Sequence, residues 1–107
     1  MSSFYTKIVG VTFEDRQRLI SRLNRRGELA SGTRLRLVPE PDNYYDPYAV
    51  KVVTMKDEQL GYISKEINKN IHINLLSGRQ YFVTVSSVSG GQSDEQNYGI
   101  NIEVRLI

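Results

Sequence analysis

The chain has 107 residues, enough for one domain, and it contains no cysteine, which excludes disulfides, thiolate metal sites and cysteine nucleophiles. The formal net charge is only +2, and no segment approaches the roughly 20 apolar residues that a membrane helix needs. The first residues lack the basic start and apolar run of a signal peptide. We therefore expect a single domain over residues 1–107, located in the cytoplasm and with no membrane partner.

Basic residues are concentrated between positions 16 and 36, where seven arginines accompany a single acid, Glu28. The acidic residues gather elsewhere, at positions 14–15, 40–46, 57–58 and 94–95. A segregated basic face suits a polyanionic partner. Solvated arginines would also simply keep a helix soluble, so both interpretations stay open.

The first strand and the first helix are predicted in residues 4–27. Phe4–Val11 is rich in β-branched side chains, which favour a strand. A helix is predicted to begin at Thr12, whose hydroxyl can accept from first-turn amides, while Asp15 complements the positive helix end. Gly27 would end this helix. Its apolar face is predicted to comprise Phe13, Leu19, Ile20 and Leu23.

Three strands and a long loop are predicted in residues 33–63. Thr33–Val38 alternates, with leucines on one side and Arg34 and Arg36 on the other, which indicates a half-buried strand with a basic outer face. Prolines at positions 39, 41 and 47 make residues 39–47 a loop. A strand over 48–55 then leads through a hairpin turn at 56–58 into a short strand over 59–63.

The last part of the chain is predicted to contain a helix and two strands. Ser64 would cap the helix and Ser77-Gly78 would end it, with Ile67, Ile71 and Leu75 on its apolar face and His72 on its surface. Strands over 80–89 and 96–107 follow, joined by a flexible turn at 90–95. These elements predict a mainly β (α+β) fold, a small six-stranded OB-like or SH3-like barrel with two helices.

The sequence offers no convergent set of catalytic groups. His72 is the single histidine and has no histidine or cysteine within metal-ligand spacing. Walker-type, Gly-x-Gly-x-x-Gly and Gly-x-Ser-x-Gly motifs are all absent from the sequence. Asp42 and Asp46 form a carboxylate pair in a loop, which alone is weak evidence for acid–base chemistry or a divalent metal. We expect a binding module with no cofactor and no metal, rather than an enzyme.

The segment from Pro39 to Val52, PEPDNYYDPYAVKV, is the most specific part of the sequence. It resembles the signature of the HIRAN domain, which has Glu-Pro, an asparagine, Tyr-Asp and then Ala-Val-x-Val at the start of a strand. Val9–Phe13 and Asp15–Gln17 resemble the family's opening strand and first helix, and Leu60–Lys65 resembles its hairpin end. The resemblance covers positions 8–70 well, and the last strands only by pattern.

This resemblance implies a nucleic-acid-binding module that recognises single-stranded DNA, in particular its 3′-hydroxyl end, in DNA repair or stalled-replication-fork processing. It implies that Asp46 binds the 3′-hydroxyl, that Tyr45 and Phe13 stack on terminal bases, and that Lys65 contacts a phosphate. Tyr98 matches a further stacking aromatic. The sequence contains no motor, so the expected partner, besides DNA 3′ ends, is a helicase or nuclease supplied in trans.

The residues themselves agree with that expectation. Single-stranded nucleic acid is held by aromatic faces and by cations along its backbone, and the segment Pro41 to Tyr48 is rich in tyrosine. Tyr62 is a further aromatic expected to converge on this segment, and Asn43 can both donate and accept hydrogen bonds. Thr12 stands where eukaryotic end binders have an arginine, so one phosphate contact is missing. The arginines of the predicted basic strand, Arg34 and Arg36, would compensate if their face bordered the pocket.

Several alternatives stay open on the sequence. Phe13 could be a core residue, Tyr45 could close the turn, Lys65 could be an ordinary exposed lysine, and Asp46 could hold the backbone of the next two residues. The tyrosines could instead anchor a protein partner, which would make the domain a protein–protein interaction module. A third hypothesis is an accessory of a nuclease or deaminase with a metal at Asp42 and Asp46.

Overall fold

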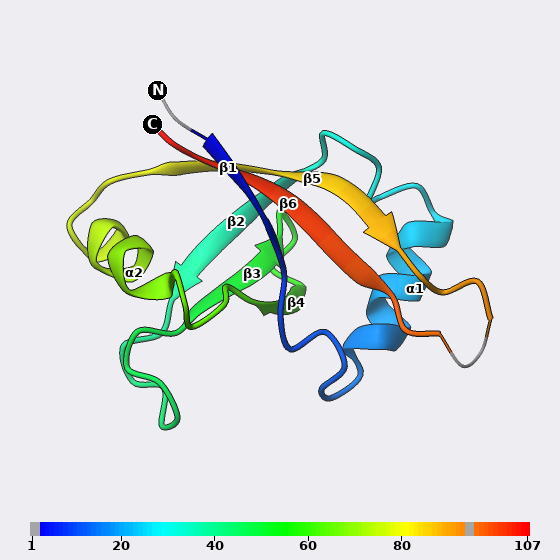
Figure 1. Ribbon diagram of the computed structural model, residues 1–107, viewed down its shortest axis with the longest axis horizontal. Helices are drawn as coiled ribbons and strands as arrows, with labels where there is room; N and C mark the ends of the chain where they lie inside the picture. The colour runs from blue at the N-terminus through cyan, green and yellow to red at the C-terminus, as the bar shows by residue number, and fades with distance from the viewer. Residues whose placement is uncertain (1–2, 94–95) are drawn as a thin grey trace.

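The computed structural model describes residues 3–93 and 96–107. Two helices and six strands follow one another along the chain (Figure 1). They are β1 (Ser3–Lys7), α1 (Arg16–Arg25), β2 (Arg34–Pro39), β3 (Val50–Thr54), β4 (Gln59–Tyr62), α2 (Asn68–Leu76), β5 (Tyr81–Ser89) and β6 (Gly99–Leu106). No helix among the described residues is long and apolar enough to cross a membrane.

The six strands form one antiparallel sheet in the order β1-β6-β5-β2-β3-β4. The sheet curls into a half-barrel, and its two edges meet at a bridge where the N–H groups of Val9 and Tyr62 each donate to the other's carbonyl oxygen at 2.9 Å. Gly61 makes this approach possible, because a Cβ there would lie 2.4 Å from the carbonyl oxygen of Val9. The predicted mainly β fold with two helices is confirmed.

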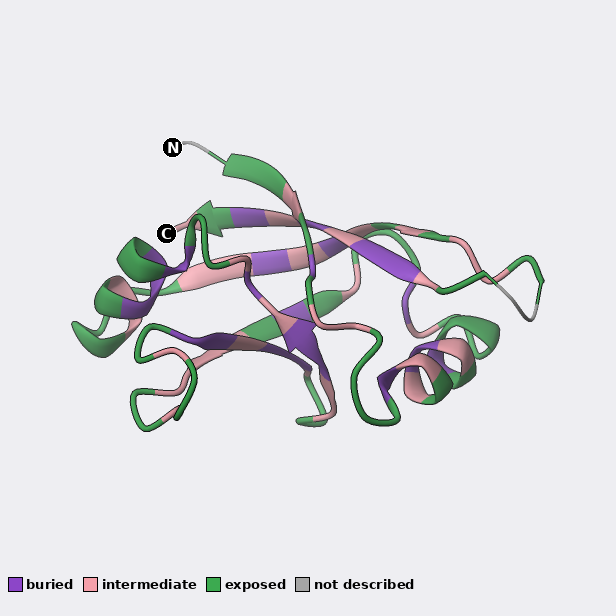
Figure 2. Cartoon of the chain, turned by 60° about the horizontal axis from the view of Figure 1, so that its bottom comes forward, coloured by how far each residue is buried: buried purple, intermediate pink, exposed green. Residues whose placement is uncertain are grey.

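One hydrophobic core lies inside the half-barrel and is closed by the two helices. Ile100, Ile102 and Val104 of β6 are fully buried and alternate with the less buried Asn101 and Glu103, and they pack with Ile20 of α1 and Leu35 of β2. Figure 2 shows buried residues along the strands, whereas the connecting loops are mostly exposed. Each buried aliphatic side chain of this kind contributes about 1.5–3 kcal/mol. The core therefore provides a rigid frame on which exposed loops can be positioned.

The segment between β1 and α1 differs from the prediction. The helix begins at Arg16, because Gly10 and Glu14 adopt left-handed conformations, with φ values of 71° and 56°, which a helix over residues 12–15 would not allow. The predicted cap at Thr12 is therefore wrong. The residue before the helix is Asp15, whose side chain makes no capping hydrogen bond.

The second helix also begins later than predicted, at Asn68, because Ser64 opens a turn in which its Oγ accepts from the Glu66 N–H at 3.3 Å. The predicted surface position of His72 is wrong, since this residue is only 3% exposed. Its Nδ1 lies 3.0 Å from the carbonyl oxygen of Ala49, a buried backbone group that needs a partner. Of the turn predicted at 90–95, residues 94–95 lie outside the described part of the chain, and β6 begins at Gly99.

Candidate functional site

The loop of residues 41–48, which we call the tyrosine loop, is held by its own polar side chains. Asn43 Oδ1 accepts from the backbone N–H of Tyr45 at 2.9 Å and from that of Asp46 at 3.0 Å. Asp46 Oδ1 in turn accepts from the Tyr48 N–H at 2.9 Å. Asparagine and aspartate favour such turns because their short side chains reach the backbone two or three residues ahead. The loop is thus formed before any ligand arrives, which lowers the entropy lost on binding.

Two tyrosine rings of this loop are left free. Tyr44 is 92% exposed and Tyr45 is 85% exposed, and their rings meet edge to face with centroids 5.3 Å apart. Asn43 closes the turn, so the Tyr45 side chain is not needed for that purpose. Exposed aromatic rings on a preformed loop are typical of a binding surface.

Asp46 has a second partner that the sequence did not predict. Its Oδ2 accepts a hydrogen bond of 2.8 Å from Nδ2 of Asn68, which is only 4% exposed and lies in the first turn of α2. The carboxylate is therefore fixed from both sides, by the Tyr48 N–H and by Asn68. A carboxylate has about four acceptor positions, so each oxygen keeps capacity for a ligand. Asp46 thus holds the loop backbone, one of the two roles considered from the sequence, and its carboxylate can still accept a hydrogen bond from a ligand.

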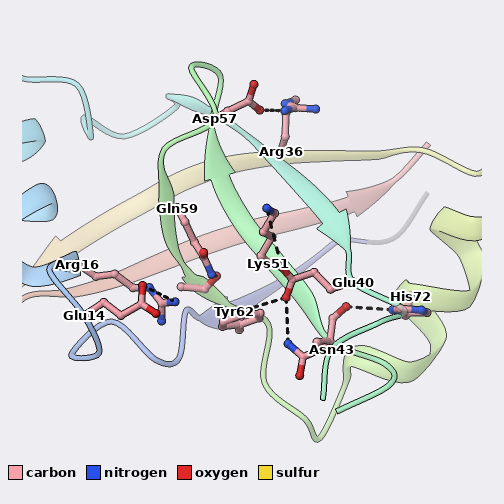
Figure 3. A network of polar contacts seen from close by, with 12 residues as sticks. Glu14, Arg16, Arg36, Glu40, Asn43, Lys51, Asp57, Gln59, Tyr62 and His72 are labelled. Carbon is pink, nitrogen blue, oxygen red and sulfur yellow. Dashed lines mark hydrogen bonds and ion pairs between the residues drawn. The ribbon is translucent and has the colours of Figure 1, made fainter. Parts of the chain in front are cut away.

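Glu40 connects the tyrosine loop to the end of β4 (Figure 3). Its Oε1 accepts from the hydroxyl of Tyr62 at 2.9 Å and from Nδ2 of Asn43 at 3.1 Å. Its Oε2 lies 3.9 Å from Nζ of Lys51. Asn43 and Tyr62 thus use their polar groups inside the protein, which makes them residues that position the loop.

On the other side of Tyr62 lies the segment between β1 and α1. The guanidinium carbon of Arg16 lies 5.3 Å from the centroid of the Tyr62 ring, and its Nη1 donates to the carbonyl oxygen of Gly10 at 2.8 Å. A Cβ at Gly10 would lie 3.7 Å from Tyr62 and 3.9 Å from Phe13. Phe13 itself is 67% exposed, so it is not a core residue. Phe13, Tyr62 and Arg16 therefore meet around one glycine.

Lys65 and Tyr98 have different surroundings. Lys65 is exposed in the turn between β4 and α2, three residues before the Asn68 that contacts Asp46. Tyr98 is half-buried against the core, and its backbone N–H and carbonyl are both bound by the side chain of Gln17 at 2.7 and 3.0 Å. A Cβ at Gly91 would fall 2.2 Å from the Tyr98 ring, so Gly91 covers part of that ring. Tyr98 is thus chiefly a packing residue in this structure.

The structure does not bring the arginines of β2 to the tyrosine loop. Arg36 forms an ion pair with Asp57 at the turn between β3 and β4 (Figure 3), and the Arg34 guanidinium lies 4.3 Å from the centroid of the Phe82 ring. A strand rises about 3.3 Å per residue, so Arg36 lies about 13 Å along the chain from Glu40. The alternation of leucine and arginine in β2 was predicted. The tyrosine loop follows the far end of this strand, so the two arginines contact Asp57 and Phe82 instead.

The alternative hypothesis of a metal held by Asp42 and Asp46 finds no third ligand among the described residues. Among residues 3–93 and 96–107, no group of three or more histidine, cysteine, aspartate or glutamate side chains is placed to hold a metal ion. Both carboxylate oxygens of Asp46 face N–H donors, which suits an acceptor of hydrogen bonds.

A family model described as the HIRAN domain matches residues 1–106. The chain belongs to the HIRAN family. HIRAN domains are nucleic-acid-binding modules and are binding domains rather than catalytic ones, which agrees with a site composed of exposed rings, a fixed acceptor and a cation. A comparison with curated proteins gave no significant match.

Two solved structures share this fold. The HIRAN domain of human HLTF has a TM-score of 0.72 and 17% sequence identity, over 98% of this chain and 74% of that one. A protein from Lactobacillus plantarum has a TM-score of 0.65 and 20% identity, over 97% of this chain and 99% of that one. At these identities the likeness establishes the common HIRAN fold.

Proposed function

We propose that this HIRAN domain binds single-stranded DNA at its 3′-hydroxyl end and acts in DNA repair or in the processing of stalled replication forks. The observation that supports the proposal most is the position of Asp46. Its carboxylate is fixed by Tyr48 and Asn68, and the residue directly before it, Tyr45, has an exposed ring. A fixed acceptor next to a free aromatic face suits the terminal nucleotide of a strand.

The negative charge of Asp46 gives the proposed specificity. Each internal nucleotide of a strand presents phosphates, which a carboxylate repels, whereas the 3′ end presents a hydroxyl that can donate a hydrogen bond. Tyr45 stacks on the terminal base, an interaction worth about 1–3 kcal/mol per base. Phe13, on the far side of Tyr62, stacks on a second base, and Lys65 contacts a phosphate. A helicase or nuclease supplied in trans would act on the bound end.

The experiment is a titration of 5′-labelled oligonucleotides followed by fluorescence anisotropy. Single strands should bind more tightly than duplexes, and log K should fall linearly with log salt concentration, because bound cations are released. Tyr45→Ala should weaken binding by about tenfold. Tyr5→Ala is the matched control, since Tyr5 is 68% exposed but lies on β1, outside the site.

The alternative function, a protein–protein interaction module, predicts a different outcome. The exposure of Tyr44 and Tyr45 would then serve as an anchor for a protein partner. A domain of that kind would show no salt-dependent affinity for single strands. Tyr45→Ala would then leave the binding of single strands unchanged. That result would refute the proposed DNA-binding function.

A further inference from the structure

Arg16 is a buried cation whose hydrogen bonds are mostly unmade. Its side chain is only 9% exposed. A guanidinium has five donors, yet the bond to Gly10 is its single hydrogen bond among the described residues, and Nε is buried without a partner there. Buried charges are normally paired and fully bonded, because desolvating them is costly. The guanidinium therefore has capacity for an anion.

The first turn of α1 adds a second feature suited to an anion. The helix has ten residues, no acidic side chain in its first turn and no side-chain capping hydrogen bond. Within the described residues, the backbone N–H groups of Gln17 and Arg18 find no acceptor, whereas that of Leu19 donates to Asp15. Open amides at a helix N-terminus attract phosphate. A cleft of about 400 Å³ lies between this turn and the start of β4. Its charged lining comprises Arg16, Arg18 and Arg22 together with the carboxylates of Glu14, Asp15 and Glu58, of which Glu58 is paired with Arg22.

Glu14 is the one carboxylate that contacts Arg16 among the described residues, and the contact is weak. Its Oε2 lies 3.8 Å from Nη2 of Arg16, and its side chain is 79% exposed. The backbone of Glu14 is left-handed, with φ of 56°, a conformation that costs a non-glycine residue roughly 1–2 kcal/mol. An exposed carboxylate that is held by a long ion pair is readily displaced by a better anion.

We propose that Arg16, together with the open first turn of α1, binds a phosphate of the single-stranded DNA. In the free protein Glu14 pairs with the Arg16 guanidinium, and the phosphate displaces the Glu14 carboxylate on binding. The proposal rests on the proposed function, because Arg16 lies over the ring of Tyr62, whose hydroxyl donates to the Glu40 that also holds Asn43 of the tyrosine loop (Figure 3). A strand whose 3′ end reaches Asp46 would then pass Tyr62 and place a phosphate at Arg16. A purely structural Arg16, which only ties α1 to Gly10, makes no such prediction.

The test combines two variants with one matched control, in single-strand titrations over a range of salt concentrations. Glu14→Gln should tighten binding about two- to fivefold, since it removes the competing carboxylate. Asp15→Asn removes the same charge one residue away without touching Arg16, and should give less than about twofold. Arg16→Gln removes the cation, and it should weaken binding roughly tenfold and reduce the slope of log K against log salt by about 0.7. Thermal melts show whether each variant is folded.

The outcomes separate this inference from the proposed function. If single strands bind but Glu14→Gln equals Asp15→Asn, and a folded Arg16→Gln keeps the wild-type salt slope, the phosphate site is refuted and end binding stands. If Arg16→Gln does not fold, the comparison of Glu14→Gln with Asp15→Asn decides, because tighter binding by Glu14→Gln alone supports the phosphate site and equal binding by the two variants refutes it. If no single strand binds, the proposed function fails. Inorganic phosphate then decides, because a saturable NMR shift of the Arg16 Nε–H signal supports an anion site and no shift refutes it.

Discussion

Replacing Asp46 tests whether the tyrosine loop is held by the carboxylate. Asp46→Ala removes two hydrogen bonds, from the Tyr48 N–H at 2.9 Å and from Asn68 Nδ2 at 2.8 Å. The Tyr48 amide is near solvent and can bond to water, which limits that loss to about 1 kcal/mol. Asn68 is only 4% exposed, and leaving its buried amide unpaired costs about 1–3 kcal/mol. The variant should therefore lower the free energy of unfolding by about 2–4 kcal/mol.

Asp46→Asn separates the charge from the shape. Its amide oxygen can still accept from Tyr48, and Asn68 can rotate its own amide to accept from the new NH2 group. Neutral bonds are about half as strong as charge-assisted ones, so the loss should be about 1 kcal/mol. Urea denaturation followed by circular dichroism measures both variants. A loss below about 0.5 kcal/mol for Asp46→Ala, or no coupling with Asn68→Ala in a double-mutant cycle, would refute this description of the loop.

Three further predictions concern the frame and the charges of the site. Gly61→Ala should lower the free energy of unfolding by about 2–3 kcal/mol in urea denaturation, because its Cβ meets a backbone oxygen at 2.4 Å. The control Gly99→Ala meets chiefly a flexible lysine and should lower it by less than about 1 kcal/mol. Equal losses for the two variants would contradict the argument. His72→Ala should lower the free energy of unfolding by about 3 kcal/mol and His72→Phe by about 1 kcal/mol, since phenylalanine keeps the packing and loses one hydrogen bond. An alanine variant as stable as the wild type would contradict a buried position of His72. Lys65→Ala should reduce the salt slope of strand binding by about 0.7 while Arg36→Ala leaves it unchanged, and the reverse result would move the interface to β2.

The fold was largely predictable because its strands carry clear alternation. In β6, the buried residues Ile100, Ile102 and Val104 alternate with polar ones, so the inward face could be assigned from the sequence. The start of α1 could not, because a left-handed backbone at Glu14 has no sequence signal as strong as that of a glycine. The predicted helix therefore began four residues too early, and Phe13 was placed on its apolar face.

The tyrosine loop was predictable as a surface, since its tyrosines, prolines and acids cluster within a few residues. Its supports were not predictable, because they come from elements distant in the sequence. Asn68 reaches Asp46 from α2, and Arg16 reaches Tyr62 from α1. A buried asparagine and a buried arginine look like surface residues in the sequence, and only their contacts show what they do. The strand direction likewise separates Arg36 from the loop.

The central claim is that Asp46 reads the hydroxyl at the end of a DNA strand. The most direct test compares two 5′-labelled single strands of one sequence, ending in a 3′-hydroxyl or in a 3′-phosphate, in binding to the wild-type domain and to Asp46→Asn. The account predicts that the wild type prefers the 3′-hydroxyl strand by about tenfold or more, because a hydrogen bond to a charged acceptor is replaced by charge repulsion. Asp46→Asn should lose most of this preference. Equal binding of both ends by the wild-type domain would contradict the claim.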